Sequence, residues 1–179
     1  MAVDVTLRPP LASDVDAIVT IFDEPDVAQW WPRYDRERIE HEFVTDVDDD
    51  TAVYLIEANG EVVGLIQSWE EADHEYRHAG MDIAVSTPWH GKGVAVAALR
   101  GLARHLVEDL GHHHLTIDPA ASNERAIRCY SKLGYRPVGI LRQNELGADG
   151  VFHDTLLMDL VAEDLVLDGP TAVIRPAGG

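Results

Sequence analysis

A glycine-rich turn is the segment of this sequence whose residue types and spacing most clearly suggest chemistry. It reads HGKGVA (residues 90–95) and lies between an expected strand and an amphipathic helix. Helix N-termini carry unpaired N–H donors and a positive dipole end, so they bind phosphate groups, and glycine lets the backbone approach such a ligand closely. The spacing differs from that of a Walker loop and of a dinucleotide-binding fingerprint. The turn therefore predicts a phosphate site, although a Gly-x-Gly pair is also compatible with a plain tight turn.

A second motif, NERAIRCYSKLGY (residues 123–135), makes the first more specific. Asn123 can cap a helix that Gly134 ends, and the inner face of that helix would hold Ala126, Ile127, Tyr130 and Leu133. Together the two segments resemble motifs A and B of the GNAT family of N-acetyltransferases, which read Arg/Gln-Gly-x-Gly-x-Gly/Ala and Asn-x-x-Ala-x-x-x-Tyr-x-x-x-Gly-Phe/Tyr. The resemblance covers residues 3–161. One departure is His90, where the family has Arg or Gln.

This resemblance implies an enzyme that uses acetyl-coenzyme A as a cosubstrate and needs no metal. The cofactor-binding residues that it implies are Val85, His90, Gly91, Lys92, Gly93, Val94, Ala95, Asn123 and Ala126. Asp82 matches the group that accepts the proton of the amine, and Tyr130 matches the general acid that protonates the departing thiolate. A backbone N–H near Val85 would stabilise the oxyanion. Without the resemblance, Asp82 could be a solvated or salt-bridged strand residue and Tyr130 a core tyrosine.

The substrate class rests on shorter stretches that resemble aminoglycoside 6'-N-acetyltransferases. These are QWW (29–31), NGE (59–61), AGMDI (79–83) and TIDP (116–119). The acceptor-binding residues implied are Trp30, Trp31, Glu61, Asp82 and Asp118. Aromatic faces stack on sugar rings or cations, although both tryptophans could equally be core residues. The open alternatives are a siderophore or lysine-type amine, a protein N-terminus, and a non-catalytic acyl-coenzyme A sensor.

Hydrophobic patterning predicts the elements that must position these residues. Strands are expected at 5–7, 51–58, 61–69, 79–85, 115–117, 135–141 and 152–160. Helices are expected after Ser13, from Asp35 to Val44, from the glycine turn to Leu110, and over 123–133. We therefore expect an α/β (α+β) GNAT fold, a mixed sheet of about seven strands flanked by about four helices. One domain would span residues 1–165, followed by a C-terminal tail, 166–179, that is loose or added at a sheet edge.

Charge restricts the partners. The chain has 14 Lys and Arg against 32 Asp and Glu, a net charge of −18. Such a field repels nucleic acid and anionic membranes and attracts polycationic small molecules, although a surface adapted to high salt would have the same composition. We expect a small-molecule amine as partner, and neither nucleic acid nor membrane. Without a leader or a long apolar run, the expectation is a cytoplasmic protein, monomeric or homodimeric.

Three further patterns could suggest other chemistry. His74-Glu75-Tyr76-Arg77-His78 spells the zinc-protease signature, but its flanks are too polar for the buried helix that this motif requires. The three histidines at 112–114 alternate in direction along an extended segment, so they would not converge on one metal. Cys129 has no base nearby in sequence and is expected to be a packing residue. We therefore predict no metal site.

Overall fold

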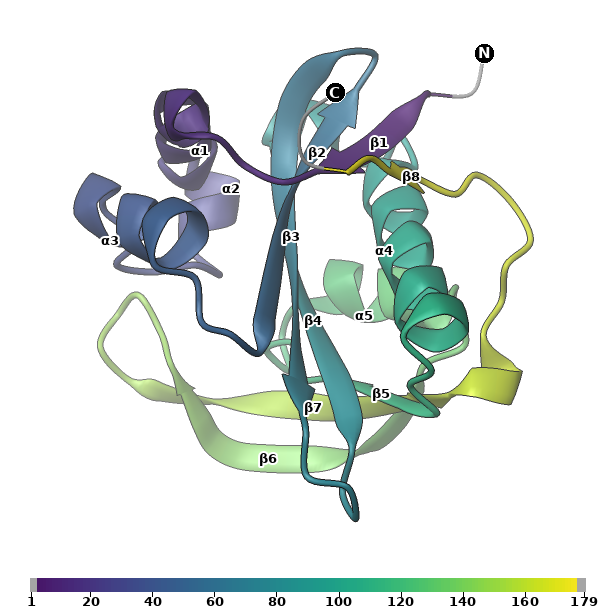
Figure 1. The fold of residues 1–179 in the computed structure, drawn as a ribbon. Helices are drawn as coiled ribbons and strands as arrows, with labels where there is room; N and C mark the ends of the chain where they lie inside the picture. Colours follow the sequence, from purple (N-terminus) through teal and green to yellow (C-terminus); the bar gives the residue numbers. More distant parts are fainter. Residues whose placement is uncertain (1–2, 177–179) are drawn as a thin grey trace.

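The computed structural model of the chain describes residues 3–176, and its centre is one mixed sheet (Figure 1). The strands are β1 (Val5–Arg8), β2 (Thr51–Ala58), β3 (Glu61–Glu71), β4 (His78–Val85), β5 (His114–Ile117), β6 (Arg136–Leu146), β7 (Phe152–Val161) and β8 (Val173–Ile174). Their order in the sheet is β6-β7-β5-β4-β3-β2-β1-β8. The first four strands are antiparallel, β4 and β5 are parallel, and β7 is antiparallel to β5 and β6.

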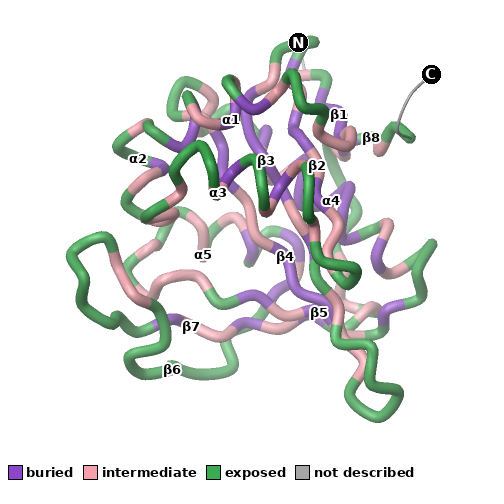
Figure 2. The backbone as a smooth tube through the Cα atoms, turned by 60° about the vertical axis from the view of Figure 1, so that its left-hand side comes forward, coloured by how far each residue is buried: buried purple, intermediate pink, exposed green. Residues whose placement is uncertain are grey.

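Helices cover both faces of this sheet. They are α1 (Val15–Phe22), α2 (Pro25–Ala28), α3 (Arg36–Glu40), α4 (Val94–Arg104) and α5 (Glu124–Ser131). Figure 1 shows α1, α2 and α3 on one side of β2 to β4, and α4 with α5 on the other. Strand alternation supplies one apolar face to each group: Leu55 and Leu65 belong to the core under α1 and α3, whereas Ile56 and Ile66 belong to the core under α4. Buried residues accordingly follow the central strands and α4 (Figure 2).

The sheet opens between its two parallel strands. β4 and β5 pair only at Ala79 with Leu115 and at Gly80 with Thr116. Beyond Gly80, β4 stays paired to β3 as far as Val85 but has no strand on its other side. In Figure 1 the strands β5, β7 and β6 run at a steep angle to β2, β3 and β4. The divergence creates a gap at the carboxyl end of β4, which is where the glycine turn begins.

The C-terminal segment packs along α4 and adds a strand to the sheet. Ala172 is fully buried, and its N–H donates to the carbonyl of Ala97 at 2.9 Å. A side chain at Gly101 would lie 2.6 Å from the carbonyl oxygen of Ala172, so only glycine permits this close crossing. β8 then pairs in parallel with β1. The expected edge addition is confirmed for Val173–Ile174.

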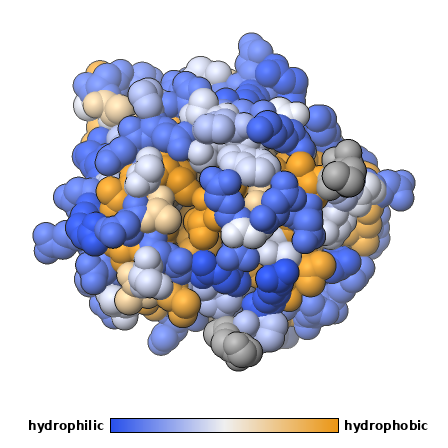
Figure 3. Space-filling view, turned by 90° about the horizontal axis from the view of Figure 1, so that it is seen from above, coloured by the Kyte–Doolittle hydropathy of each residue, from blue (hydrophilic) through white to orange (hydrophobic). Residues whose placement is uncertain are grey.

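The expected fold class is confirmed, with two additions. All seven predicted strands are present, and the tight turn between β2 and β3 has positive φ at both Asn59 and Gly60, as a type I′ turn requires. The position of β8 within the tail was not predicted, and neither was the four-residue α2. The second expected helix is regular only to Glu40 and continues as a π-helical turn over His41–Thr45. Seen from above, the surface is mainly polar with scattered apolar side chains (Figure 3), and none of the helices within residues 3–176 is long and apolar enough to span a bilayer.

Candidate active site

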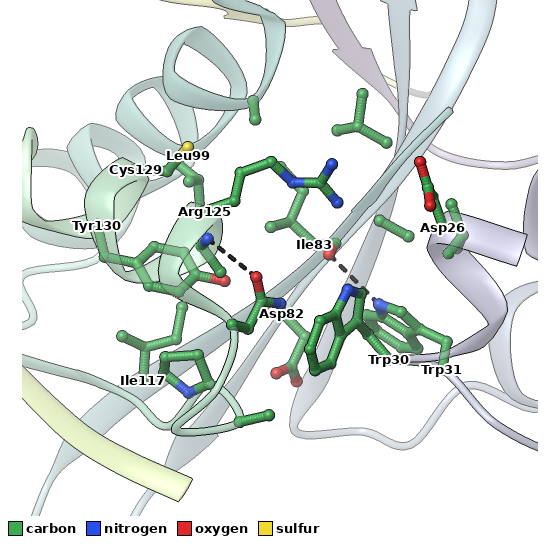
Figure 4. A pocket seen from close by; sticks show the side chains of 18 of the residues that line it. Asp26, Trp30, Trp31, Asp82, Ile83, Leu99, Ile117, Arg125, Cys129 and Tyr130 are labelled. Carbon is green, nitrogen blue, oxygen red and sulfur yellow. Dashed lines mark hydrogen bonds between the residues drawn. The ribbon is translucent and has the colours of Figure 1, made fainter. Parts of the chain in front are cut away.

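A cleft of about 760 Å³ occupies the gap between β4 and β5. One end is lined by the glycine turn, the start of α4 and the inner face of α5, and the other by α2, the loop after it and the β6–β7 hairpin. Asp82 lies in the middle, with Tyr130 on one side and Trp30 and Trp31 on the other (Figure 4). The structure thus brings the two expected catalytic residues and both expected tryptophans to one cavity.

The backbone of Val85 faces this gap. The N–H of Ser86 donates to the carbonyl of Val63 at 2.8 Å, so this pair is hydrogen-bonded and the next pair, Gly64 and Val85, is not. Hydrogen-bonded and non-bonded pairs alternate in an antiparallel ladder. The N–H and the carbonyl of Val85 therefore point away from β3, toward the side on which β4 has no neighbour. A free N–H in this place can donate to a ligand oxygen.

The glycine turn presents an open backbone at the start of α4. Gly91 and Gly93 have φ values of 74° and 84°, and Gly93 is the N-cap residue of the helix. Nothing lies within 4 Å of the position that a side chain would occupy at either glycine. Val94 and Ala95, which follow, are among the residues that line the cleft. The turn thus leaves open space beside the N-terminus of a helix, where N–H donors and the helix dipole favour a phosphate group.

Two cofactor candidates at this turn have protein partners of their own. The ammonium of Lys92 lies over the ring of Trp89, 4.8 Å from its centre, and Lys92 is not among the residues that line the cleft. Nε2 of His90 lies 2.7 Å from the carbonyl oxygen of Val85, and Nδ1 lies 2.7 Å from a guanidinium nitrogen of Arg125. A direct contact of either residue with phosphate stays a prediction.

α5 supplies the other wall at the cofactor end. Asn123 caps this helix, accepting a hydrogen bond from the N–H of Ala126 at 3.1 Å, and both residues line the cleft. Tyr130 also lines it, although its side chain is only 5% exposed. Burial, together with the negative charge of Asp82, raises the pKa of Tyr130 well above its usual value. The Tyr130 hydroxyl therefore stays protonated at neutral pH and remains a hydrogen-bond donor.

Three carboxyl groups meet at the acceptor end. Burial raises the pKa of Asp82 to about 6, against a weak hydrogen bond of 3.3 Å from Gln67. Burial also raises the pKa of Asp118, which follows β5 and accepts a hydrogen bond from Asn144 at 2.9 Å. In Glu145 burial raises the pKa, and the charges of Asp118 and Asp82 add to the effect. Each carboxylate is held at an energetic cost that a cationic ligand would remove.

Aromatic residues close this end of the cleft. The indole N–H of Trp31 donates to the carbonyl of Ile83 at 3.4 Å, and its ring packs edge-on against Phe22 and Tyr34. Trp31 is thus both a packing residue and a wall of the cleft, while Trp30 lies beside it. Glu61 starts β3 at the hairpin turn, is exposed, and is not among the residues lining the cleft. Its predicted contact with the acceptor has no geometric support here.

Several lining residues escaped the sequence analysis. They are Asp26, Arg33, Tyr34, Gln67, Arg125, Asn144 and Glu145. Arg33 joins two distant segments, since its guanidinium donates to the carbonyls of Leu146 and Gly147 at 2.9 and 3.0 Å. Asn144 and Glu145 lie on β6, beyond every recognisable motif. Arg125 lies inside the second motif, and its charge in an acidic chain was the available signal.

The zinc-protease pattern does not form a site. Asp73, His74, Glu75 and Tyr76 lie in or beside a turn between β3 and β4, and His78 already belongs to β4. The side chain of His112 is buried and contacts Glu70, while His114 faces Asp159. Across residues 3–176, no three His, Cys, Asp or Glu side chains come close enough to hold a metal ion.

Comparisons with known proteins identify the family. Residues 4–136 match the family described as Acetyltransferase (GNAT) domain. The chain belongs to the GNAT family. Aminoglycoside N(6')-acetyltransferase type 1 of Klebsiella pneumoniae is 26% identical over 151 residues, which are 75% of each chain. Spermidine N(1)-acetyltransferase of Escherichia coli is 29% identical over 111 residues, 62% of this chain and 59% of that protein.

Solved structures agree with this assignment. An aminoglycoside acetyltransferase in complex with coenzyme A superimposes with a TM-score of 0.74 at 25% identity, covering 90% of this chain and 96% of that one. The fold is shared with spermidine N-acetyltransferase of Vibrio cholerae, with a TM-score of 0.76 at 19% identity over 90% and 97% of the two chains. This GNAT protein is an acetyl-coenzyme A-dependent N-acetyltransferase. Of the two open classes, an enzyme and a non-catalytic sensor, the comparisons support the enzyme.

Proposed function

We propose that this GNAT enzyme acetylates a primary amine of a polycationic small molecule, and that the best candidate is the 6'-amino group of an aminoglycoside. The observation that carries the proposal is the meeting of Asp82, Asp118 and Glu145 at the acceptor end, where burial raises the pKa of each. Several ammonium groups on one ligand would neutralise several of these carboxylates together. A ligand with a single positive charge would leave the others uncompensated.

Asp82 is the base in this proposal. An alkylamine is mostly protonated at neutral pH and must lose a proton before its nitrogen can attack the thioester. A carboxylate whose pKa is about 6 is ionised at neutral pH and is a better proton acceptor than an ordinary aspartate. Gln67 donates a hydrogen bond to it and so orients the carboxylate. The proton passes to Asp82 directly or through a water molecule.

Val85 and Tyr130 serve the acetyl group in the next step. The amine nitrogen bonds to the acetyl carbon, and the negative charge that develops on the carbonyl oxygen is stabilised by the N–H of Val85. The carbon–sulfur bond then breaks. The Tyr130 hydroxyl, kept protonated by burial, donates its hydrogen to the thiolate of coenzyme A as it leaves. The second proton, which the nitrogen releases as the amide forms, returns to Tyr130 directly or through water. The glycine turn, with Asn123 and Ala126, would hold the diphosphate and the pantetheine arm.

The relatives support a cationic acceptor and name two kinds. One is an aminoglycoside acetyltransferase and another a spermidine acetyltransferase. The aromatic wall formed by Trp30, Trp31 and Tyr34 favours the first kind, because aromatic faces stack on sugar rings. A linear polyamine would use the carboxylates and could place an ammonium over an aromatic ring, but it has no sugar ring to stack there.

An acceptor panel tests this proposal. Purified enzyme and acetyl-coenzyme A are incubated with kanamycin, spermidine, lysine, an N-terminal peptide and butylamine, and the products are read by mass spectrometry. We expect the highest kcat/KM with the aminoglycoside and the lowest with butylamine. Preferred acetylation of spermidine would support a polycationic acceptor and contradict an aminoglycoside. Preferred acetylation of lysine or the peptide would contradict both claims.

A further inference from the structure

His90 is not free to offer a ligand the positive charge that an arginine at its place in the motif would bring. Its Nε2 lies 2.7 Å from the Val85 carbonyl oxygen, which only accepts hydrogen bonds. Its Nδ1 lies 2.7 Å from the guanidinium of Arg125, which only donates them. The two partners assign a proton to Nε2 and a lone pair to Nδ1. Both ring nitrogens of His90 are therefore engaged by protein partners.

Arg125 is placed to supply this charge instead. It extends from the first turn of α5 across the cleft and ends beside the residue that opens the glycine turn (Figure 4). Among the residues that the structure describes, its guanidinium has one hydrogen-bond partner, His90, and no carboxylate within 4.0 Å. A guanidinium has five N–H donors in a fork suited to phosphate. In a chain with net charge −18, an arginine that avoids carboxylates next to a diphosphate site calls for an anionic ligand.

We propose that Arg125 binds the diphosphate of acetyl-coenzyme A and that His90 acts as a positioning residue for the end of β4. Arg125 then takes over the hydrogen-bonding role of the arginine or glutamine that His90 replaces in the motif. His90 fixes the Val85 carbonyl and so the Val85–Ser86 peptide. This restrains the backbone torsions of Val85, on which the direction of its own N–H, in the preceding peptide, depends. The proposal rests on the cofactor site assigned above and adds two roles to it.

The two roles predict different kinetic signatures. Removing the diphosphate contact weakens binding of the whole cofactor and leaves the chemistry unchanged. Removing the Val85 contact disturbs the geometry of the reacting centre and lowers kcat. S-acetylpantetheine separates the two effects, because it carries the acetyl thioester without the diphosphate or the nucleotide.

Arg125→Ala is compared with wild type using acetyl-coenzyme A and S-acetylpantetheine as donors. Loss of a charge-assisted contact predicts a KM for acetyl-coenzyme A raised about 10- to 100-fold, with kcat and the rate with S-acetylpantetheine unchanged. Arg104→Ala is the control, since it removes the same charge from an exposed position outside the cleft. An equal loss with both donors, or no loss with either, overturns the role of Arg125. Persistence of the loss with acetyl-dephospho-coenzyme A supports the diphosphate, and its disappearance there overturns it in favour of the 3'-phosphate.

His90→Ala and His90→Gln test the second role. The alanine variant is expected to lose about tenfold in kcat with both donors, about the worth of one hydrogen bond. Glutamine, with one amide donor and one acceptor, can bond both Val85 and Arg125 and is expected to restore kcat. Failure of glutamine to restore it, or a change in KM alone, overturns the positioning role. All assays use the best acceptor of the panel, so an error in the acceptor class would not imitate either failure.

Discussion

The two ends of the cleft are lined by side chains of opposite charge. At the cofactor end, Arg125, Arg128 and Lys132 line the cavity beside backbone amides at the start of α4. At the acceptor end, Asp26, Asp82, Asp118 and Glu145 line it, and the two arginines there are already engaged. Arg33 binds backbone carbonyls, and Arg38 binds Glu42 at 2.7 Å and lies over the ring of Tyr34.

This contrast explains how an acidic protein handles an anionic cofactor. A net charge of −18 repels coenzyme A at long range, so binding depends on short-range donors concentrated in one place. The acceptor end needs no such local correction, because the field of the whole chain already attracts a polycation. Four predictions test whether the cofactor end binds through short-range donors and the acceptor end through negative charge.

The largest effect is expected at Asp82, the proposed base. Asp82→Asn removes the base and should lower kcat/KM about 100- to 10,000-fold. In wild type, kcat/KM should fall as the pH drops through about 6, because the carboxylate becomes protonated there. This loss of activity at acidic pH should be absent in the variant. The raised pKa means that the charged form destabilises the fold above that pH, so the variant should melt at a higher temperature at pH 8. If kcat/KM of the variant still falls at acidic pH as it does in wild type, another group is the base.

The next effect tests the cofactor side of the chemistry. Tyr130→Phe removes the hydroxyl and keeps the buried ring, so kcat should fall about 100-fold. The dissociation constant of coenzyme A, measured by calorimetry, should stay within about twofold, since the ring contacts remain. Wild-type kcat in this variant would remove Tyr130 from the mechanism, while a parallel loss of binding would make it a cofactor-holding residue.

A smaller effect is expected from the other carboxylates. Asp118→Asn and Glu145→Gln should each lower kcat/KM for the polycationic acceptor about tenfold, as expected for a hydrogen bond to a charged group, and much less for butylamine. Added salt should reduce the difference. Glu108→Gln, in the π-helical turn that follows α4 and outside the cleft, is the matched control. Equal losses of kcat/KM with both amines would show that these carboxylates maintain the structure of the site and do not recognise the charge of the acceptor.

The smallest effect is expected at Glu24, which bridges the two ends. It lies directly before α2, and it accepts hydrogen bonds of 2.6 Å from the Ser86 hydroxyl and from the N–H of Thr87. Burial raises the pKa of Glu24, but these bonds outweigh it and lower the pKa below its usual value. Its stabilising effect is therefore present at neutral pH and lost on acidification. Glu24→Gln should cost about 1 kcal/mol in the free energy of unfolding at pH 7, and the cost should shrink at pH 4; a constant cost would rule out a charge effect.

The cofactor end was largely predictable from the sequence, for a physical reason. Its parts are local: the glycine turn and the helix after it are contiguous, and so are Asn123, Ala126 and Tyr130. A helix start needs its capping and glycine residues at fixed spacing, so the chemistry leaves a pattern along the chain. What the pattern did not show was that the ring of His90 turns back to Val85 and Arg125, because both contacts arise from tertiary structure.

The acceptor end was only partly predictable. It is assembled from α2, the ends of β4 and β5, and the β6–β7 hairpin, which are far apart along the chain. Resemblance located Trp30, Trp31, Asp82 and Asp118, which the structure does bring to the cleft. It also suggested Glu61, which lies elsewhere, and it missed Glu145, because an acidic residue on an exposed edge strand has no signature. The eighth strand escaped for a similar reason, since two residues are too short for periodicity.

The close crossing at Gly101 links the far end of the chain to cofactor binding. Ala172 rests on Gly101 and bonds the carbonyl of Ala97, whose own N–H bonds the carbonyl of Gly93 in the glycine turn. Trimming the protein after Leu165, by a protease or by design, would uncover a strip of α4 one helical turn away from that glycine. The segment from residue 166 to residue 174 thus supports the first turns of α4, and shortened versions should lose affinity for acetyl-coenzyme A before they lose their fold.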